Sequence, residues 1–175
     1  MRPSFTPCSI RRLLALLPFA TCVAVVAPRA PLAQASFDAT PTAQCLLDGN
    51  GEACIGRAAE LCVTLPGNGT TIGLGYCYGE ELAWWDSRLN AVYVDLRAKE
   101  RATDAEMAGS TLNLPSQAEA LKAMQRAWIS YRDAACEYEY SQWSGGTGGG
   151  PASAACQMEL TARQTLWLER YLLDH

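Results

Sequence analysis

Two pairs of carboxylates are the side chains whose types and spacing could do catalytic chemistry. Glu81 with Asp86, or Asp133 with Glu137, could serve as general acid and base on a glycan. Each pair also fits the solvated face of a helix, where acidic side chains are common. We favour that structural interpretation for both pairs.

The remaining polar residues do not indicate an activated nucleophile. The base in such a set is usually His, and the single His of the chain is His175, at an end where chains are usually mobile. Ser130, Ser153 and Thr161 have no evident partner that would activate them. The glycine-rich run at 144–150 follows no predicted strand, so it is interpreted as a flexible connector and not as a phosphate-binding loop. We therefore predict no enzymatic activity and no cofactor.

Cysteine is the residue type that carries the clearest signal. Cys8 and Cys22 lie in a predicted leader, and their removal leaves an even set in the mature chain: Cys45, Cys54, Cys62, Cys77, Cys136 and Cys156. An even number of cysteines in an exported protein predicts disulfides. Zinc is the competing interpretation, but the chain has no CxxC pair and only a terminal His, so we predict no metal site.

Spacing limits how the four N-terminal cysteines can pair. The segment between Cys54 and Cys62 is expected to be helical, which would separate the two by roughly 12 Å, too far for a disulfide. Of the three possible pairings, this favours Cys45 with Cys54 and Cys62 with Cys77, although the sequence leaves the choice open.

The chain is organised around two helices that face each other across the glycine-rich run. The sequences WISYRDAAC, ending at Cys136, and CQMELTARQTLW, starting at Cys156, are both amphipathic. Each glycine in a helix costs about 1 kcal/mol, so residues 144–150 are expected to be a loop. We therefore predict a helical hairpin stapled by a Cys136–Cys156 disulfide.

The first residues have the features of an export signal. Three arginines precede an apolar run at 13–27, which is too short for a membrane span. A small-x-small pattern ends at Ala35, so residues 1–35 are predicted to be a signal peptide cleaved after Ala35. Lipidation at Cys22 is the alternative, and the residues before it make a poor lipobox. We expect a periplasmic or secreted protein with no stable insertion in a membrane.

Removal of this leader makes the chain distinctly acidic. Residues 36–175 carry ten Lys and Arg against 18 Asp and Glu, a net charge of −8. Nucleic acid and anionic membrane surfaces are disfavoured as partners, because they require clustered cations. The partner class that this balance permits is a cationic protein.

Helical periodicity runs through most of the mature chain, and no useful β-alternation occurs. Apolar side chains recur every three or four residues at about 78–107, at 116–140 and after Pro151. Ser116 and Glu119 form the pattern of a capping box at the start of the second segment.

The predicted fold is all-α. It is a small disulfide-stapled bundle of three longer helices, preceded by a short Cys-rich helical cap. The expected divisions are a signal peptide at 1–35, the cap at 36–76 and the helical domain at 77–175.

Facing sides of the bundle are predicted to hold a cluster that is either a binding site or a structural polar network: Trp128, Tyr131, Arg132, Asp133, Arg163 and Asp86. Arg132 lies one residue off the apolar stripe of its helix, and Arg163 lies on the stripe of the partner helix. A buried Arg needs a partner, because an unpaired buried charge is costly. Asp86, Asp133 and Glu159 are the candidates, and an inter-helix ion pair that fixes the register is favoured over a ligand-facing role.

Several aromatic residues could either fill the core or form a contact surface. Trp84 and Trp85 point about 100° apart on one helix, so one can be buried while the other stays partly exposed. Tyr138, Tyr140 and Trp143 would make a contact surface if they were exposed. We favour core packing for most of these rings.

The hairpin resembles the LprI-like family of exported bacterial proteins, long described as a domain of unknown function. The resemblance covers about residues 77–173 and rests on WISYRDAAC, the glycine-rich spacer and CQMELTARQTLWL, with WWDSRLNAVYVDL upstream. It implies a helical, disulfide-bonded envelope protein and suggests lysozyme inhibition, the activity that gives the family its name. The segment from Cys45 to Cys77 lies outside the general pattern, and no inhibitory residue is transferred.

We therefore expect a monomeric or weakly associating, non-enzymatic binding protein of the bacterial envelope. Lysozymes are usually strongly basic, so an acidic domain would be steered toward them, and an acidic loop or helix face would enter the basic cleft. The alternative is a structural or scaffolding periplasmic module that binds peptidoglycan or another envelope protein.

Overall fold

The computed structural model describes residues 36–173, which belong to one compact unit. The predicted signal peptide, its cleavage site after Ala35 and the alternative lipidation at Cys22 lie outside the described residues. All regular structure within 36–173 is helical, which confirms the all-α prediction. No helix in this range combines the length and the apolar character that crossing a bilayer requires.

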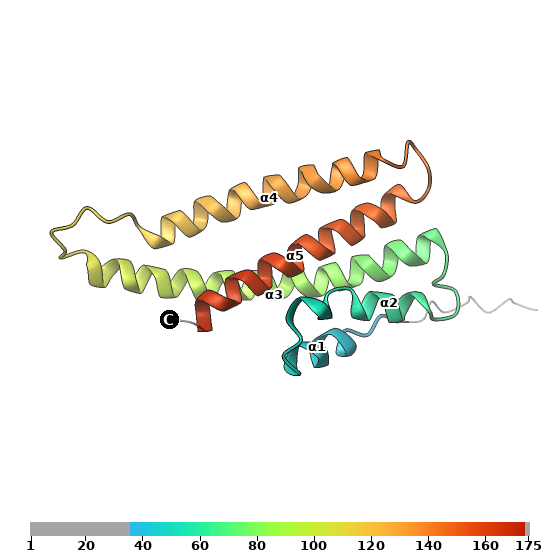
Figure 1. The fold of residues 1–175 in the computed structure, drawn as a ribbon, viewed down its shortest axis with the longest axis horizontal. Helices are drawn as coiled ribbons and strands as arrows, with labels where there is room; N and C mark the ends of the chain where they lie inside the picture. Colours follow the sequence, from blue (N-terminus) through green and yellow to red (C-terminus); the bar gives the residue numbers. More distant parts are fainter. Residues whose placement is uncertain (1–35, 174–175) are drawn as a thin grey trace, which may run out of the picture. The chain divides into compact units, whose positions relative to one another are not determined.

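Three long helices form the bundle, as predicted. They are α3 (Thr71–Met107), α4 (Gln117–Ser141) and α5 (Gly149–Leu173). Figure 1 shows that α4 runs antiparallel to both α3 and α5, so that α3 and α5 are parallel. Helix α3 begins at Thr71 and not near residue 78 as predicted. Thr70 caps it, because its hydroxyl accepts a hydrogen bond from Gly73 N at 3.1 Å.

The start of α4 is fixed by two side chains. Ser116 is the N-cap and its hydroxyl accepts from Glu119 N at 3.2 Å, as the capping pattern predicted, while the Glu119 side chain bonds to Lys122. The Ser116 hydroxyl donates to Asp104 at 2.6 Å, and Gln117 N donates to the same carboxyl group at 2.7 Å. These two bonds lower the pKa of Asp104 below its ordinary value. Asp104 therefore fastens the end of α3 to the first turn of α4.

The start of α5 differs from the prediction, since Gly149 and Gly150 are helical. Gly149 is buried, and an added Cβ there would stand 3.0 Å from the ring of Tyr140. The first turn of α5 can therefore lie this close to α4 because it has no side chain at that position.

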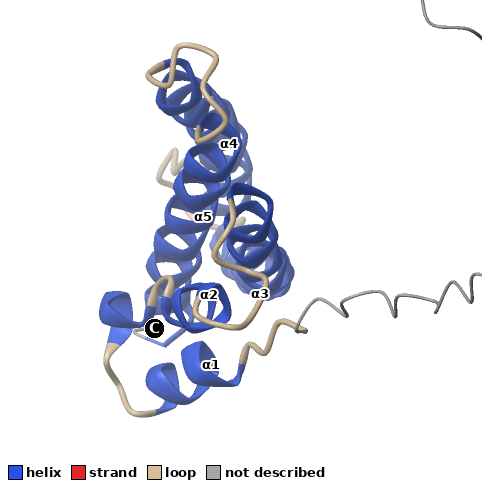
Figure 2. Ribbon diagram, turned by 90° about the vertical axis from the view of Figure 1, so that its right-hand side faces the viewer, coloured by secondary structure: helices blue, strands red, loops and turns tan. Residues whose placement is uncertain are grey.

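The cap consists of three short elements on one side of the α3–α5 pair, with α4 on the other side (Figure 2). These are α1 (Thr40–Leu47), the 3-10 helix η1 (Gly51–Cys54) and α2 (Arg57–Val63).

Both favoured disulfides of the N-terminal cysteines are present. Cys45 is bonded to Cys54 within the cap, with Cα atoms 5.5 Å apart, and Cys62 of α2 is bonded to Cys77 of α3 at 5.7 Å. The expected boundary between 76 and 77 falls inside α3, and the division into a cap and a helical domain stays a prediction.

Glu81 connects the cap to the bundle from the middle of the core. Its side chain has no exposed surface. One carboxyl oxygen accepts from the Thr42 hydroxyl at 3.0 Å, from Gly56 N at 3.0 Å and from Trp85 Nε1 at 3.1 Å. The other oxygen accepts from Ala59 N at 2.6 Å. The carboxyl group thus satisfies N–H groups at the start of α2 that have no partner inside that helix.

Apolar side chains form two adjoining core clusters along α3 and α5. Trp85 is fully buried in the first, beside the cap, and Trp84 packs against it edge to face at 4.8 Å, only partly buried. The second continues toward the far end of α3, where Leu89, Leu96 and Leu168 are buried. One tryptophan of the adjacent pair therefore fills the core, as their angular separation on the helix predicted.

Candidate functional site

The predicted staple between α4 and α5 is present. Cys136 and Cys156 are bonded, with Cα atoms 5.5 Å apart. A second link, which the sequence analysis missed, is a hydrogen bond of 3.0 Å from Gln164 Nε2 to Gln125 Oε1 between two buried side chains. Gln125 lies four residues after the buried Leu121 and therefore on the same face of α4, and this spacing was the sequence signal that its side chain is buried. Together the two links hold α4 and α5 in one register.

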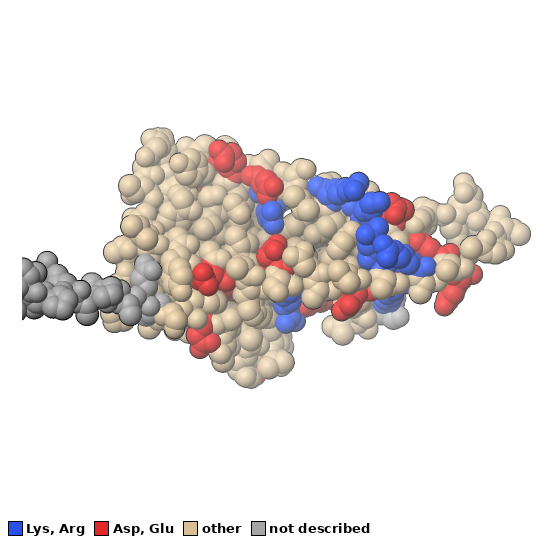
Figure 3. All heavy atoms as spheres, turned by 180° about the vertical axis from the view of Figure 1, so that it is seen from behind, with Lys and Arg blue, Asp and Glu red and all other residues tan. Residues whose placement is uncertain are grey.

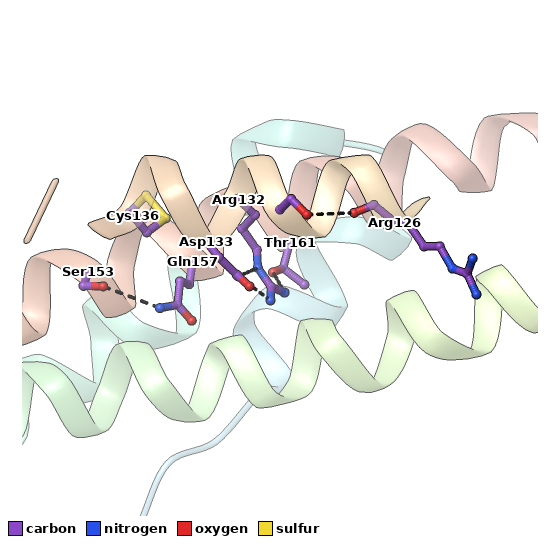
Figure 4. Close-up of polar contacts among 9 residues, drawn as sticks. Arg126, Arg132, Asp133, Cys136, Ser153, Gln157 and Thr161 are labelled. Atoms are coloured by element: carbon purple, nitrogen blue, oxygen red, sulfur yellow. Dashed lines mark hydrogen bonds and ion pairs between the residues drawn. A yellow bond between two sulfur atoms is a disulfide. The ribbon is translucent and has the colours of Figure 1, made fainter. Parts of the chain in front are cut away.

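Arg132 makes most of the contacts found within the predicted polar cluster, and Figure 4 shows it beside Asp133 and Thr161. Its guanidinium bonds to Asp133 on the same helix at 2.8 Å, and its Nη1 donates to the buried Thr161 hydroxyl of α5 at 3.5 Å. The same group lies 5.0 Å from the centroid of the Trp128 ring, a cation–π contact. The ion pair of Arg132 therefore joins neighbouring residues on α4. Its contact with the facing helix is a hydrogen bond to the Thr161 hydroxyl and not the expected inter-helix ion pair.

Arg163 has two carboxylate partners of its own. It bonds to Glu159 one turn earlier on α5 at 2.8 Å and to Glu52 of η1 at 2.6 Å. The hydrogen bond with Glu159, aided by the charge of Glu52, raises the pKa of this guanidinium. Glu159 was an expected partner, whereas Glu52 was not. The third candidate, Asp86, instead accepts a hydrogen bond from Asn90 along α3 and forms no ion pair with an Arg of the described residues.

A groove of about 660 Å³ beside α5 contains part of this cluster. Trp128, Arg163, Glu52 and Trp167 are among the residues that line it. The structure therefore brings Trp128, Arg132 and Asp133 together and places Arg163 in the groove that Trp128 lines. Tyr131 is mostly exposed and lies outside this groove.

The two carboxylate pairs have different surroundings from those that catalysis on a glycan would need. Glu81 is buried and both of its oxygens are occupied by donors, so the expected solvated position is wrong for this residue. Asp133 is held by Arg132. Within residues 36–173, His, Cys, Asp and Glu form no group of three that could hold a metal ion. The geometry gives Glu81 and Asp133 structural roles.

Aromatic side chains are exposed at the end of the hairpin. Tyr138, Tyr140 and Trp143 are 68%, 46% and 48% exposed, so the favoured core packing is wrong for these three. The indole of Trp143 lies on Gly148, where an added Cβ would overlap the ring. A hydrogen bond of 2.7 Å from Gly146 N to Trp143 O closes the turn below these rings. The surface at this end is therefore aromatic and is shaped by glycine contacts.

Charge is distributed unevenly along the bundle. Residues 133–162 contain no Lys or Arg, and Arg57 is the single cation of residues 36–87, whereas these two segments together hold eleven Asp and Glu. The other nine cations of the described residues lie at 88–132 and 163–173, with six Asp and Glu. Figure 3 shows Lys and Arg gathered over one half of the visible face. The half that contains the hairpin end is therefore the acidic one.

These features define a class of protein: a disulfide-bonded, all-α module of the kind that folds outside the reducing cytoplasm. The family model described as Lysozyme inhibitor LprI matches residues 62–168, and the chain belongs to this family. The resemblance seen in the hairpin is thereby confirmed. The matched range includes the Cys62–Cys77 and Cys136–Cys156 disulfides and leaves out Cys45–Cys54.

Two relatives are similar over most of their own length. The chain is 31% identical to the uncharacterized protein R02472 of Rhizobium meliloti (strain 1021), over 64% of this chain and 88% of that protein. It is 25% identical to the uncharacterized 17.7 kDa protein in the puhA 5'region of Rhodobacter capsulatus, over 88% of this chain and 95% of that protein. No solved structure matches the chain. The disulfides and the family together indicate an extracytoplasmic protein.

Proposed function

We propose that this chain is an exported, non-enzymatic lysozyme inhibitor that binds its target through an acidic surface. The observation that carries the proposal is the family match over residues 62–168. The mature chain, taken from residue 36, has a net charge of −8. Lysozymes are usually strongly basic, so the two proteins would attract each other at long range. The inhibitor would act as a monomer that covers the substrate cleft of lysozyme, and it would catalyse no reaction itself.

The polar cluster of the hairpin has a supporting role in this proposal. Arg132 forms an ion pair with Asp133 and a cation–π contact with Trp128, and it donates a hydrogen bond to Thr161 on the facing helix. The Arg163–Glu52 ion pair joins the cap to α5 in the same way. These contacts keep the helices in place, so that the carboxylates of the acidic half have a fixed arrangement.

A lysis assay tests the proposal. Purified residues 36–175 are added at micromolar concentration to lysozymes of the chicken, goose and invertebrate types, and the clearing of a cell-wall suspension is followed. We expect slower clearing with at least one enzyme. The inhibition should weaken as salt rises from about 0.05 to 0.3 M, because salt screens surface charges.

Two results would count against inhibition. Unchanged clearing with every lysozyme would refute the proposal. Retention of the chain on insoluble peptidoglycan, without an effect on clearing, would favour the alternative of a scaffolding module. A reduced and alkylated sample is the control, since it retains the sequence and the acidic side chains but lacks the disulfide-bonded fold.

A further inference from the structure

We infer that the end of the helical hairpin, residues 137–147, is the surface that docks on a cationic protein, with its aromatic rings entering the basic cleft. This inference rests on the proposed function, because it names the part of the chain that meets lysozyme. Three independent features of the hairpin end support it: exposure of its rings, rigidity and charge.

The exposed rings provide the contact area. Every residue from Glu137 to Thr147 is exposed. Tyr138, Tyr140 and Trp143 each leave about half of their surface or more in solvent. Tyr and Trp are enriched among the residues that dominate binding energies, because a large rigid ring buries much area at a small entropic cost.

The hairpin end is already held in one shape before any partner binds. The Cys136–Cys156 disulfide ties α4 to α5 directly below it. Gly148 supports the indole of Trp143, and the Gly146–Trp143 hydrogen bond closes the turn. A preorganised surface loses less conformational entropy on binding. The glycine-rich run thus acts as a platform for the rings.

Charge decides which partner fits. Glu137 and Glu139 are exposed, and neither has an ion-pair partner among the described residues. Residues 133–162 contain no Lys or Arg, so both carboxylates can bond to cations of another protein. Two copies of this chain that met through their hairpin ends would set like charges against each other, which is unfavourable. A cationic protein is therefore the occupant that the surface selects.

An apolar hollow away from the hairpin end is a poorer site for such a partner. A groove of about 400 Å³ is lined by Leu121, Trp167 and Tyr171, among others. Its lining residues all come from the segments 88–132 and 163–173, which together hold nine of the ten cations of the described residues. These cations would repel a basic protein.

Three variants test the inference against the wild-type mature chain. Y138A with W143A removes two rings, and E137Q with E139Q removes two charges from the hairpin end. The matched control, D95N with E106Q, removes two charges from exposed positions in the other half of the bundle. Y138A alone is also measured, because its ring is the most exposed and its loss should not disturb the turn.

The inhibition constant and its salt dependence are the readouts. We expect each double variant at the hairpin end to weaken inhibition about tenfold or more, and Y138A alone by about threefold or more. E137Q with E139Q should also flatten the salt dependence. The inhibition constant of the control should stay within about twofold of wild type. The control loses the same net charge as E137Q with E139Q, but it loses this charge far from the proposed docking surface.

The outcomes separate this inference from the proposed function. If wild type inhibits and the hairpin-end variants inhibit equally well, the docking surface is wrong while the inhibitor function stands. If wild type does not inhibit, binding to immobilised chicken-type lysozyme is measured at low salt. Binding that only the hairpin-end variants lose would still support the surface, whereas no binding, or equal binding by all variants, would overturn it.

Discussion

Glu81 is the residue whose substitution should destabilise the fold most for the smallest change in shape. Glu81→Gln keeps the size of the side chain and replaces one oxygen by an NH₂ group. In the structure both oxygens accept hydrogen bonds, three at one oxygen and one from Ala59 N at the other. The best orientation of the amide keeps the oxygen at the triple site and turns its NH₂ group toward Ala59 N–H.

The magnitude follows from these contacts. The variant loses the 2.6 Å bond from Ala59 N, and a hydrogen bond to a charged group contributes about 1.5–3 kcal/mol. It also leaves two donors facing each other in a fully buried site, each of which costs about 1–3 kcal/mol when unsatisfied. We therefore expect the free energy of unfolding to fall by about 3–5 kcal/mol, a large part of the stability of a domain this size.

Urea unfolding of the oxidised protein, followed by far-ultraviolet circular dichroism and tryptophan fluorescence, measures this loss. Glu80→Gln is the matched control, because Glu80 is the exposed neighbour on the same helix. The control should change the free energy of unfolding by less than about 0.5 kcal/mol. A loss below about 1 kcal/mol for Glu81→Gln would refute the role assigned to the buried carboxyl group.

Three further predictions concern the hairpin and the turn between α3 and α4. Replacing Cys136 and Cys156 by Ser opens a loop with a sequence separation of 20 and should lower the free energy of unfolding by about 3 kcal/mol in urea titrations. Gly148→Ala should push the indole off the turn, cost about 1–3 kcal/mol and shift the indole N–H signal of that ring in NMR spectra; an unshifted signal would contradict the contact. The hydrogen bonds that lower the pKa of Asp104 stabilise the fold above the ordinary pKa of this group, and this stabilisation is lost as the pH falls through the folded-state pKa. Hydrogen exchange at Gln117 N–H, which donates to Asp104, should therefore become faster in that acid range. In an Asp104→Asn variant the exchange should show no such step.

The helices and disulfides could be predicted because they depend on local spacing. Apolar residues every three or four positions indicated the long helices, and the reach of a disulfide favoured the pairing of Cys45 with Cys54, which the structure contains. The first turns of α3 were missed because their glycines favour a loop. Thr70 supplies a cap there and the Cys62–Cys77 bond anchors the helix, which sequence propensity alone does not reveal.

The polar contacts were harder to predict, because they depend on which segments meet in space. Glu81 stands four residues before the buried Trp85, on the apolar stripe of α3, and this position was a signal of burial. Its donors come from the cap, however, and no spacing along the chain places them beside it. The ion pair between Glu52 and Arg163 could not be predicted for the same reason, because it forms only when the cap folds against α5.

The uneven charge of the bundle affects how this protein meets others before any contact forms. A uniformly acidic particle is pulled toward a basic one but can arrive in any orientation. Here one half holds eleven acidic residues and one cation, while the other holds nine cations, so the molecule is also an electric dipole. In the field of a basic partner such a dipole experiences a torque that turns its negative end forward. Encounter would then begin with the hairpin end already leading, and the rotational search that slows most protein associations would be shortened.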